Sequence, residues 1–415
     1  MVAKVTLNRT LSLPMMVLYG LGTTIGAGIY ALVGEIALVS GYFSPVSFLI
    51  ASLLAGFTAI SFAELCGRFP YAAGAAIYVK HGFSSKRLST IVGLLVVTAA
   101  VVSSAALLNG FVGYLHQFIG MERVVAIILV TLLLGGIAAW GIAESVTIAS
   151  LITIIEIGGL LLVIAVSNTA LAEFSTRWRE LIPSADIISW RGIFVGAILS
   201  FYAFIGFEDM VDVAEEVKDV ERNLPIAILL TLGITTIIYL LLMITAVLSV
   251  PPSELASTTT PLVYLFEYHT GRNATVISII AIFAIINGAL IQMIMASRVL
   301  YGMSSRGQLP GLIGIVNKWT QTPLIATALV TAIVLTLALI GRLASLAQTT
   351  SLIMLCIFSL VNLALWRIKR KEPNPPGVRP SPVESSPPRF WCLHSPFSGI
   401  RKCRESVSLL CSRNC

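Results

Sequence analysis

Long runs of apolar residues, separated by short polar segments, make up most of this chain. Many of the runs reach about 20 residues, the length that an α-helix needs to cross the hydrocarbon layer of a bilayer. Lipid offers no hydrogen-bond partners to backbone N–H and C=O groups, and the runs are too long for barrel strands, so each run should be a helix. The pattern therefore predicts an all-α integral membrane protein embedded in a lipid bilayer.

We expect about ten spans, because an apolar helix of about 20 residues fits each long run. The expected spans are 14–39, 44–64, 88–115, 124–141, 145–167, 192–213, 225–249, 274–300, 323–340 and 344–366. The chain then divides into an N-terminal segment (1–13), a first five-helix unit (14–168), a second five-helix unit (169–366) and a tail (367–415).

The distribution of basic residues predicts the orientation. Segments on the side of the N-terminus carry more Lys and Arg, including Lys4, Lys86 and Lys218, than the segments on the opposite side. Cytoplasmic loops are the ones enriched in Lys and Arg. We therefore expect a multi-pass protein of the cell (cytoplasmic) membrane with its N-terminus in the cytoplasm.

Composition narrows the function classes. Of the 415 residues, 57% are hydrophobic and only 11% are charged, against about 25% charged residues in an ordinary soluble domain. The net charge of +7 is spread between apolar runs rather than gathered with aromatics, which argues against a nucleic-acid partner. No GxxxxGK[ST] loop and no metal-ligand spacing occur, and the four histidines lie outside the centres of the expected spans. We expect no nucleotide partner, no metal, no cofactor and no enzyme activity.

After Trp366 the composition changes to Pro, Ser, Arg and Cys, and such a segment cannot cross a membrane. Two interpretations stay open for the tail. It is either a disordered cytoplasmic extension or the product of a frameshift or truncation that replaced further spans.

Two expected spans carry helix-breaking residues at matching places. The first contains GLGTTIGAGIY, with Gly26, Ala27 and Gly28 in its middle, and the sixth contains FYAFIGFED, with Gly206 near its centre. Glycine in a membrane helix often only lets neighbouring helices approach. Here the two spans are the first members of two sets of five, and interrupted helices at corresponding positions are the best sequence indication of a transporter site.

The first break would suit a carboxylate. If the chain unwinds at Gly26-Ala27-Gly28, a half-helix begins near Gly28 with its positive end and free N–H groups at the middle of the membrane. No charged side chain is needed to hold a substrate carboxylate there.

The carbonyl ends of the two breaks would suit an ammonium group. Carbonyls near Thr24 and Ile25 in the first span, and near Tyr202, Ile205 and Gly206 in the sixth, lose their helical partners and are free to accept hydrogen bonds. The two breaks together therefore predict a site for a zwitterion. Tyr202 is either an aromatic lid over the substrate or ordinary packing.

Two carboxylates and two amides in the spans are candidate polar groups of the pathway. Glu156 lies within LITIIEIGGLLLVI and must pair with another helix, face water or take up a proton, and Glu208 follows the sixth-span break. Both are candidates for proton coupling or gating, and Glu156 also has the alternative of a neutral group bonded to a backbone carbonyl. The carboxylates after Glu208 are expected to form a wetted helix end that pairs with Lys218 or Arg222. Asn287 and Gln292 face either the pathway or a neighbouring helix.

Four segments together resemble the amino acid-polyamine-organocation superfamily: GLGTTIGAGIY, AELCGRFPYAAGAAIYVKHGF, GFEDMVDVAEEVKDVERNLPIAI and ASRVLYGMSSRGQLP. The resemblance covers roughly residues 10 to 366. It implies the inverted five-plus-five helix fold with broken helices 1 and 6. It also implies two further helices that often follow in that family, which favours the truncation interpretation of the tail.

The resemblance also implies roles for single residues. Ala27 and Gly28 would meet the substrate carboxylate, and the carbonyls of Thr24, Tyr202 and Ile205 would meet the amino group. Many relatives have Ser in place of Ala27, so backbone amides must suffice here. Relatives in the cationic branch carry a lysine near Glu156, and in this respect the chain departs from that branch.

The predicted function is secondary active transport of an amino acid or related amine by alternating access, with proton symport or exchange as the coupling. The alternatives are a transport-inactive truncated homologue, a substrate sensor that keeps the site without flux, and a channel. A channel is disfavoured because no symmetric filter repeat or continuous polar run occurs.

If Glu156 carries the coupling proton, Glu156→Gln should abolish the pH dependence of substrate accumulation, because the amide cannot take up or release a proton. Accumulation in proteoliposomes at several external pH values measures this. An unchanged pH dependence in the variant would exclude the role.

Overall fold

The computed structural model describes residues 11–69, 74–140, 146–317, 319–320 and 322–371. Over these residues the chain is helical, and the extended pairing present is an isolated parallel bridge between Leu11 and Val217. The predicted all-α class is confirmed for this part of the chain. The N-terminal segment 1–13 and the tail 367–415 fall largely outside the described residues.

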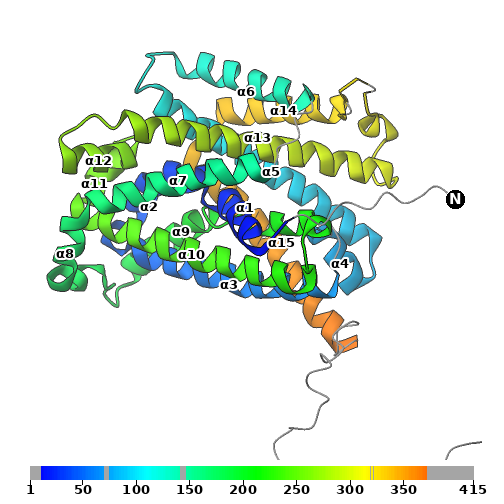
Figure 1. Cartoon of the computed structure of the whole chain (residues 1–415), viewed down its shortest axis with the longest axis horizontal. Helices are drawn as coiled ribbons and strands as arrows, with labels where there is room; N and C mark the ends of the chain where they lie inside the picture. Colours follow the sequence, from blue (N-terminus) through cyan, green and yellow to red (C-terminus); the bar gives the residue numbers. More distant parts are fainter. Residues whose placement is uncertain (1–10, 70–73, 141–145, 318, 321, 372–415) are drawn as a thin grey trace, which may run out of the picture. The chain divides into compact units, whose positions relative to one another are not determined.

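Helices lie over each of the ten ranges expected to span the membrane (Figure 1). Their bounds are α1 Leu13–Ile25, α2 Ala27–Ser40, α3 Ser44–Arg68, α4 Ala75–Phe83, α5 Lys86–Leu115, α6 Arg123–Trp140, α7 Val146–Val166, α8 Asn168–Arg177, α9 Ile187–Tyr202, α10 Val220–Ser249, α11 Pro252–Ser257, α12 Pro261–Thr270, α13 Thr275–Ser305, α14 Leu324–Ile340 and α15 Leu343–Lys371. Short 3₁₀ helices are η1 Gly41–Phe43, η2 Trp178–Leu181, η3 Phe207–Glu216 and η4 Gly311–Gly314.

Within the described residues, seven helical stretches are long and apolar enough to cross a membrane. An eighth results if the pair Ser150–Val166 and Asn168–Leu181, bent by 59°, counts as one span. The helices α1 and α14 are apolar but shorter. A multi-pass membrane protein is therefore confirmed, whereas the number ten and the inverted five-plus-five relation stay predictions.

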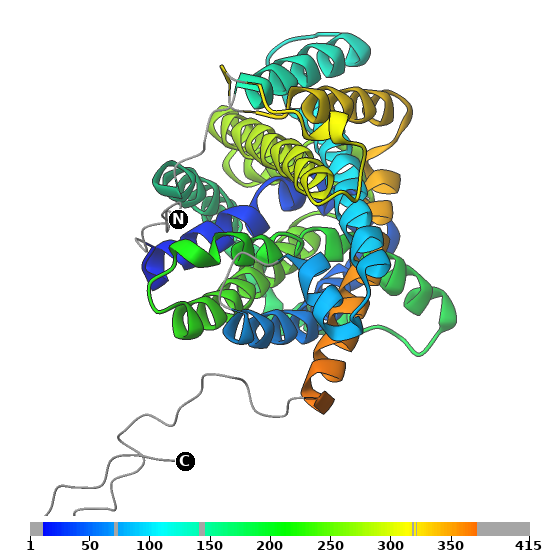
Figure 2. The ribbon, with the colours of Figure 1, turned by 90° about the vertical axis from the view of Figure 1, so that its right-hand side faces the viewer.

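The helices pack in pairs drawn from the two halves of the chain. Helix α3 packs against α10, α5 against α13, and α6 against α14 (Figures 1 and 2). Helix α3 also contacts α9, and α10 contacts α1, while α15 contacts α5 and α13 contacts α7. Each half of the chain therefore packs mainly by contacting its counterpart.

Aromatic rings fill the space where α3, α4, η3 and α15 meet. The ring of Phe62 lies edge-on against Tyr78, Phe207 and Phe358, with centroids 5.7 to 5.9 Å apart. Edge-to-face pairs of this kind contribute about 0.5–1.5 kcal/mol each beyond their buried area. This cluster fixes η3 beside α15.

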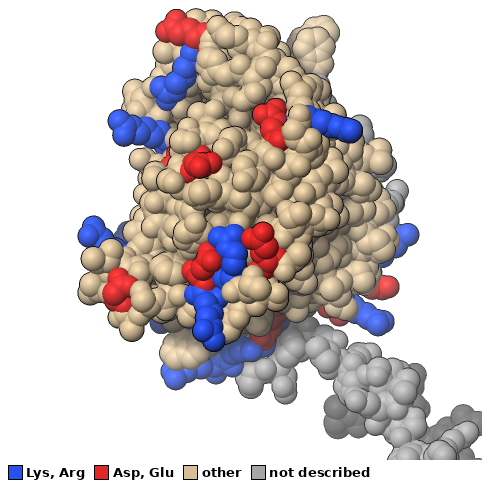
Figure 3. Space-filling view, turned by 90° about the vertical axis from the view of Figure 1, so that its left-hand side faces the viewer, with Lys and Arg blue, Asp and Glu red and all other residues tan. Residues whose placement is uncertain are grey.

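The outer surface has the character expected of a lipid-facing bundle. Large apolar side chains such as Phe57, Leu133 and Phe283 are more than half exposed. On the face shown in Figure 3, charged side chains form a few small groups on a surface composed mostly of uncharged residues. Glu64 at the end of α3 binds both Arg68 (2.7 Å) and Lys369 of α15 (2.5 Å), so charges at the helix ends also join separate helices.

Close helix contacts depend on glycine, and Gly192 is the position where α9 approaches α2. A Cβ at Gly192 would lie 2.4 Å from the Val39 carbonyl oxygen, a backbone atom that cannot move alone. Gly136 of α6, by contrast, has nothing within 4 Å of a built Cβ.

We expect Gly192→Ala to lower the free energy of unfolding by about 1–3 kcal/mol through overpacking. Gly136→Ala should be neutral or slightly stabilising, because it gains the same helix propensity as Gly192→Ala without a steric clash. Unfolding of the purified variants in the same detergent measures the difference. Equal midpoints for the two variants would contradict the packing argument.

Candidate functional site

Both predicted helix breaks are present. Helix α1 ends at Ile25 and α2 begins at Ala27, with Gly26 between them at φ −35° and ψ −135°. Helix α9 ends at Tyr202, and after a turn the chain continues as the 3₁₀ helix η3 from Phe207. Glycine permits such departures from helical geometry because it lacks a Cβ.

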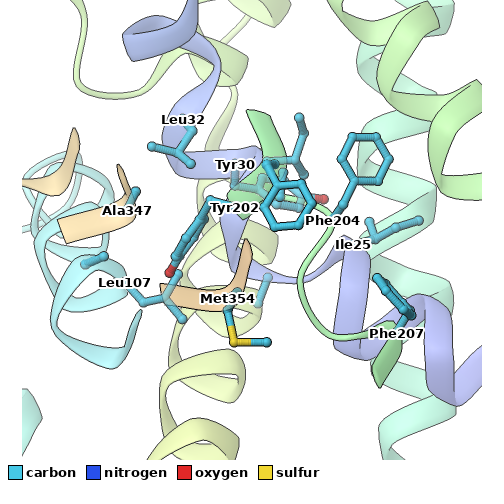
Figure 4. Packing of buried hydrophobic residues seen from close by; sticks show 14 of the residues in the cluster. Ile25, Tyr30, Leu32, Leu107, Tyr202, Phe204, Phe207, Ala347 and Met354 are labelled. Atoms are coloured by element: carbon cyan, nitrogen blue, oxygen red, sulfur yellow. The ribbon is translucent and has the colours of Figure 1, made fainter. Parts of the chain in front are cut away.

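The two breaks contact each other through their backbones. Gly206 has φ +127°, and a Cβ there would lie 2.2 Å from the Thr23 carbonyl oxygen. A Cβ on Gly28 would lie 3.2 Å from Cα of Ala203 and 3.3 Å from the Tyr202 ring. Figure 4 shows Ile25, Tyr202 and Phe204 gathered at this junction. The glycines are therefore required by the approach of one break to the other.

Tyr239 of α10 bridges the two breaks, and the sequence interpretation missed it. Its hydroxyl lies 3.1 Å from the Thr24 carbonyl oxygen and 3.0 Å from that of Ala203. Its ring packs edge-on against Phe48 and Phe204. A tyrosine in the middle of an apolar span needs a hydrogen-bond partner for its hydroxyl. That requirement could have identified Tyr239 from the sequence.

The predicted carbonyl acceptors keep a free lone pair. The Thr24 carbonyl accepts from Tyr239, and the Tyr202 carbonyl accepts from the Ile205 N–H at 3.2 Å. A carbonyl oxygen can accept two hydrogen bonds, so each can still meet a donor on a ligand. At the first break, the first N–H groups of α2 have no partner within their own helix. The Ala27 side chain lies outside the described part.

A small cavity of about 40 Å³ lies at the junction, with room for a few water molecules. Of the predicted site residues, Thr24, Gly26, Gly28, Tyr202 and Ile205 line it. The structure adds lining residues that were not predicted for the site, among them Ser103, Leu107, Asp209 and Gly288, and of the two alternatives for Gln292 it favours the pathway, because Gln292 also lines the cavity. Ile25 and Gly206 belong to the breaks but do not appear in this lining.

A larger cavity of about 980 Å³, here called the vestibule, adjoins the small one. The two share Ser103, Ile205, Asp209, Ile291 and Gln292 in their linings. The vestibule extends along η3 and past the end of α13, where Arg306 lines it, to the segment before α1, where Leu11 lines it. The site is thus accessible from the end of the bundle at which α1 begins.

Tyr202 is held at the wall of the small cavity. Its hydroxyl lies 2.9 Å from Oγ of Ser103 on α5, and the side chain is only 5% exposed. Figure 4 shows its ring directed towards Leu107. The residue therefore connects the sixth-span break to α5.

The two predicted coupling carboxylates occupy different places. Glu208 accepts a hydrogen bond of 2.9 Å from the Gly206 N–H and lines the vestibule. Glu156 is buried in α7 at 2% exposed, and its backbone carbonyl accepts a hydrogen bond of 2.6 Å from the Tyr30 hydroxyl. Glu208 thus stabilises a break directly, whereas Glu156 lies outside the residues that line the two cavities.

Asp209 differs from the expectation of a wetted helix end. It is only 8% exposed, lines both cavities, and forms no ion pair with Lys218 or Arg222 among the described side chains. The chain after the break is the 3₁₀ helix η3, and Asp209 lies on it beside both cavities, whereas Asp212 of the same helix is exposed.

The geometry defines a helical membrane protein with two interrupted spans around a polar junction. Residues 10–396 match the family model described as amino acid permease. This chain belongs to that family.

Individual relatives show the range of the family. The chain is 30% identical to "Cationic amino acid transporter 2, vacuolar" of Arabidopsis thaliana, over 98% of this chain and 64% of the relative. It is 26% identical to the branched-chain amino acid permease BcaP of Bacillus subtilis, over 89% of this chain and 83% of the relative. The methylthioribose transporter of the same bacterium is 24% identical, over 94% of this chain and 89% of the relative. The chain spans less than two thirds of the length of the plant relatives.

Removing the Tyr239 hydroxyl should loosen both breaks. In Tyr239→Phe the buried Thr24 and Ala203 carbonyls lose a shared donor, a loss of about 1–3 kcal/mol. We expect faster amide hydrogen exchange in peptides from both breaks, around residues 20–30 and 200–210. Tyr268→Phe, which removes a hydroxyl from a side chain that is 57% exposed, is the matched control. Unchanged exchange at the breaks would show that the bridge is not stabilising.

Proposed function

We propose that this protein is a secondary active transporter that carries amino acids across the cell membrane by alternating access. The observation that carries the proposal is the contact between two helix breaks beside a cavity that adjoins a vestibule. Interrupted helices at the middle of the membrane are typical of the substrate sites of secondary transporters.

The junction suits an α-amino acid backbone. The N-terminal end of α2 offers N–H groups and a positive helix end to a carboxylate. The Thr24 and Tyr202 carbonyls, each with a spare lone pair, accept hydrogen bonds from the ammonium group. On this proposal Ile25, Gly26, Ala27, Ile205 and Gly206 supply the unwound backbone.

We infer ten spans arranged as two inverted five-helix units, 14–168 and 169–366. Support comes from paired contacts between the two halves. Helix α3 contacts α10, the corresponding helix of the other half. The contact of α3 with α9 has its counterpart in the contact of α10 with α1. Similarly, the contact of α5 with α15 matches that of α13 with α7. A two-fold relation between the halves would produce such matched contacts.

With the N-terminus in the cytoplasm, the vestibule faces the cytoplasm, and the structure corresponds to an inward-open state. The same assignment places the tail 367–415 in the cytoplasm. Proton coupling or exchange fits this scheme, with Glu208 and Glu156 as candidate groups. An amino acid substrate is supported by relatives that are cationic amino acid transporters or a branched-chain amino acid permease.

The proposal predicts gradient-driven uptake that a bulky residue at the junction abolishes. In Gly28→Trp the indole would occupy the space beside Ala203 and Tyr202, so we expect uptake of a radiolabelled amino acid mixture to fall at least about tenfold. The assay uses proteoliposomes with and without an inward proton gradient. Gly158→Trp is the control, because this glycine of α7 is exposed and has nothing within 4 Å of its built Cβ.

Other outcomes distinguish the alternatives. Substrate binding without flux would favour a sensor or a transport-inactive homologue. Uptake rates far above carrier turnover that never saturate with substrate would favour a channel. Either result would overturn the transporter assignment.

A further inference from the structure

One carboxylate at the junction has no described protein partner. Asp209 is only 8% exposed, yet its side chain lines both the small cavity and the vestibule. Among the side chains that the structure describes, none forms a hydrogen bond or an ion pair with the Asp209 carboxylate. The remaining exposed fraction of the side chain therefore faces the cavities.

The neighbouring charged residues do not take this place. Glu208 is occupied by the Gly206 N–H, and Asp212 is exposed and lines the vestibule without reaching the lining of the small cavity. Arg298 and Arg306 also line the vestibule and are absent from the lining of the small cavity. In the small cavity, Asp209 is thus the only charged residue among the described lining residues.

A buried carboxylate without a countercharge is costly, because the interior replaces water poorly as a solvent for an ion. A cationic group arriving in the cavity would supply the countercharge. The substrate's α-ammonium is already accounted for by the break carbonyls of Thr24 and Tyr202. A second cationic group, on another part of the substrate, would then be the partner of Asp209.

We propose that Asp209 is the specificity-determining residue of the site, and that it binds an amine or guanidinium on the substrate's side chain. The preferred substrates are therefore amino acids with cationic side chains. Ser103 and Gln292, which also line both cavities, offer polar groups beside this second charge. The inference rests on the proposed function for the placement of the substrate backbone, and it adds the class of side chain.

Binding and uptake are measured together on the full chain, so that the two proposals can fail separately. Binding of L-lysine, L-arginine and L-leucine is measured calorimetrically in detergent, and uptake of the same compounds in proteoliposomes. We expect the unmodified chain to prefer L-lysine or L-arginine over L-leucine. Asp209→Asn should weaken binding of L-lysine by about tenfold or more, since one partner of a buried charge pair is lost, and should leave L-leucine binding within about twofold.

Asp212→Asn is the matched control, because it removes the same charge from the vestibule but not from the small cavity. It should change L-lysine binding by less than about threefold, as expected for a solvent-screened charge. Asp209→Glu, which keeps the charge, should retain the preference for L-lysine.

The outcomes of these experiments distinguish the transport proposal from the inference about Asp209. Selective binding of L-lysine without uptake supports the role of Asp209 and overturns the transport function. Uptake of L-leucine in preference to L-lysine supports transport and overturns the inference. An equal loss of all three compounds in Asp209→Asn, with a normal unfolding midpoint, would likewise overturn a role in side-chain selection.

Discussion

The structure depends on the direct contact between two unwound backbone segments inside an apolar bundle. Lipid cannot satisfy backbone N–H and C=O groups, so a helix can be interrupted there only where protein or a polar cavity replaces the lost partners. Gly206 makes the contact possible, because any Cβ would overlap the Thr23 carbonyl. The backbone groups of both breaks then find hydrogen-bond partners at one junction, and the remaining polar groups of the breaks face the cavity.

Several further bonds hold this junction together. Tyr239 bonds to a carbonyl on each side, and Glu208 accepts from the Gly206 N–H. At the mouth of the vestibule, the Leu11 N–H donates to the Glu216 carbonyl and the Leu11 carbonyl accepts from the Lys218 N–H. The first and sixth interrupted spans are therefore joined both at their breaks and at the end of η3. A movement of one should carry the other with it.

Local residues made much of this predictable. Apolar runs define helices because the bilayer leaves the backbone no alternative, and Gly26 and Gly206 mark breaks because the departure from helical geometry occurs at the glycine itself.

Tyr239 was not found, since its partners are more than 30 residues away and meet it only when α10 packs on both breaks. Asp209 was expected at a wetted helix end, and only the packing around η3 places its side chain in the linings of both cavities. The sequence could place Gln292 on the pathway or on a neighbour, and only the packing of α13 against α5 directs it to the cavity.

The sizes of the two cavities constrain how a ligand could be held. About 40 Å³ at the junction accommodates a few waters and not a whole amino acid, whereas the adjoining vestibule of about 980 Å³ is larger than a small ligand requires. A ligand anchored at the breaks must therefore extend past Asp209 and Gln292 into the vestibule, and only an inward movement of the vestibule walls could enclose it. Those walls include η3, which the backbone bonds of Leu11 join to the start of α1, and α15, which Lys369 joins to Glu64 on α3. Phe62 packs against Phe207 of η3 and Phe358 of α15, so these two walls are already in contact, and enclosure would require other parts of the lining to move inward.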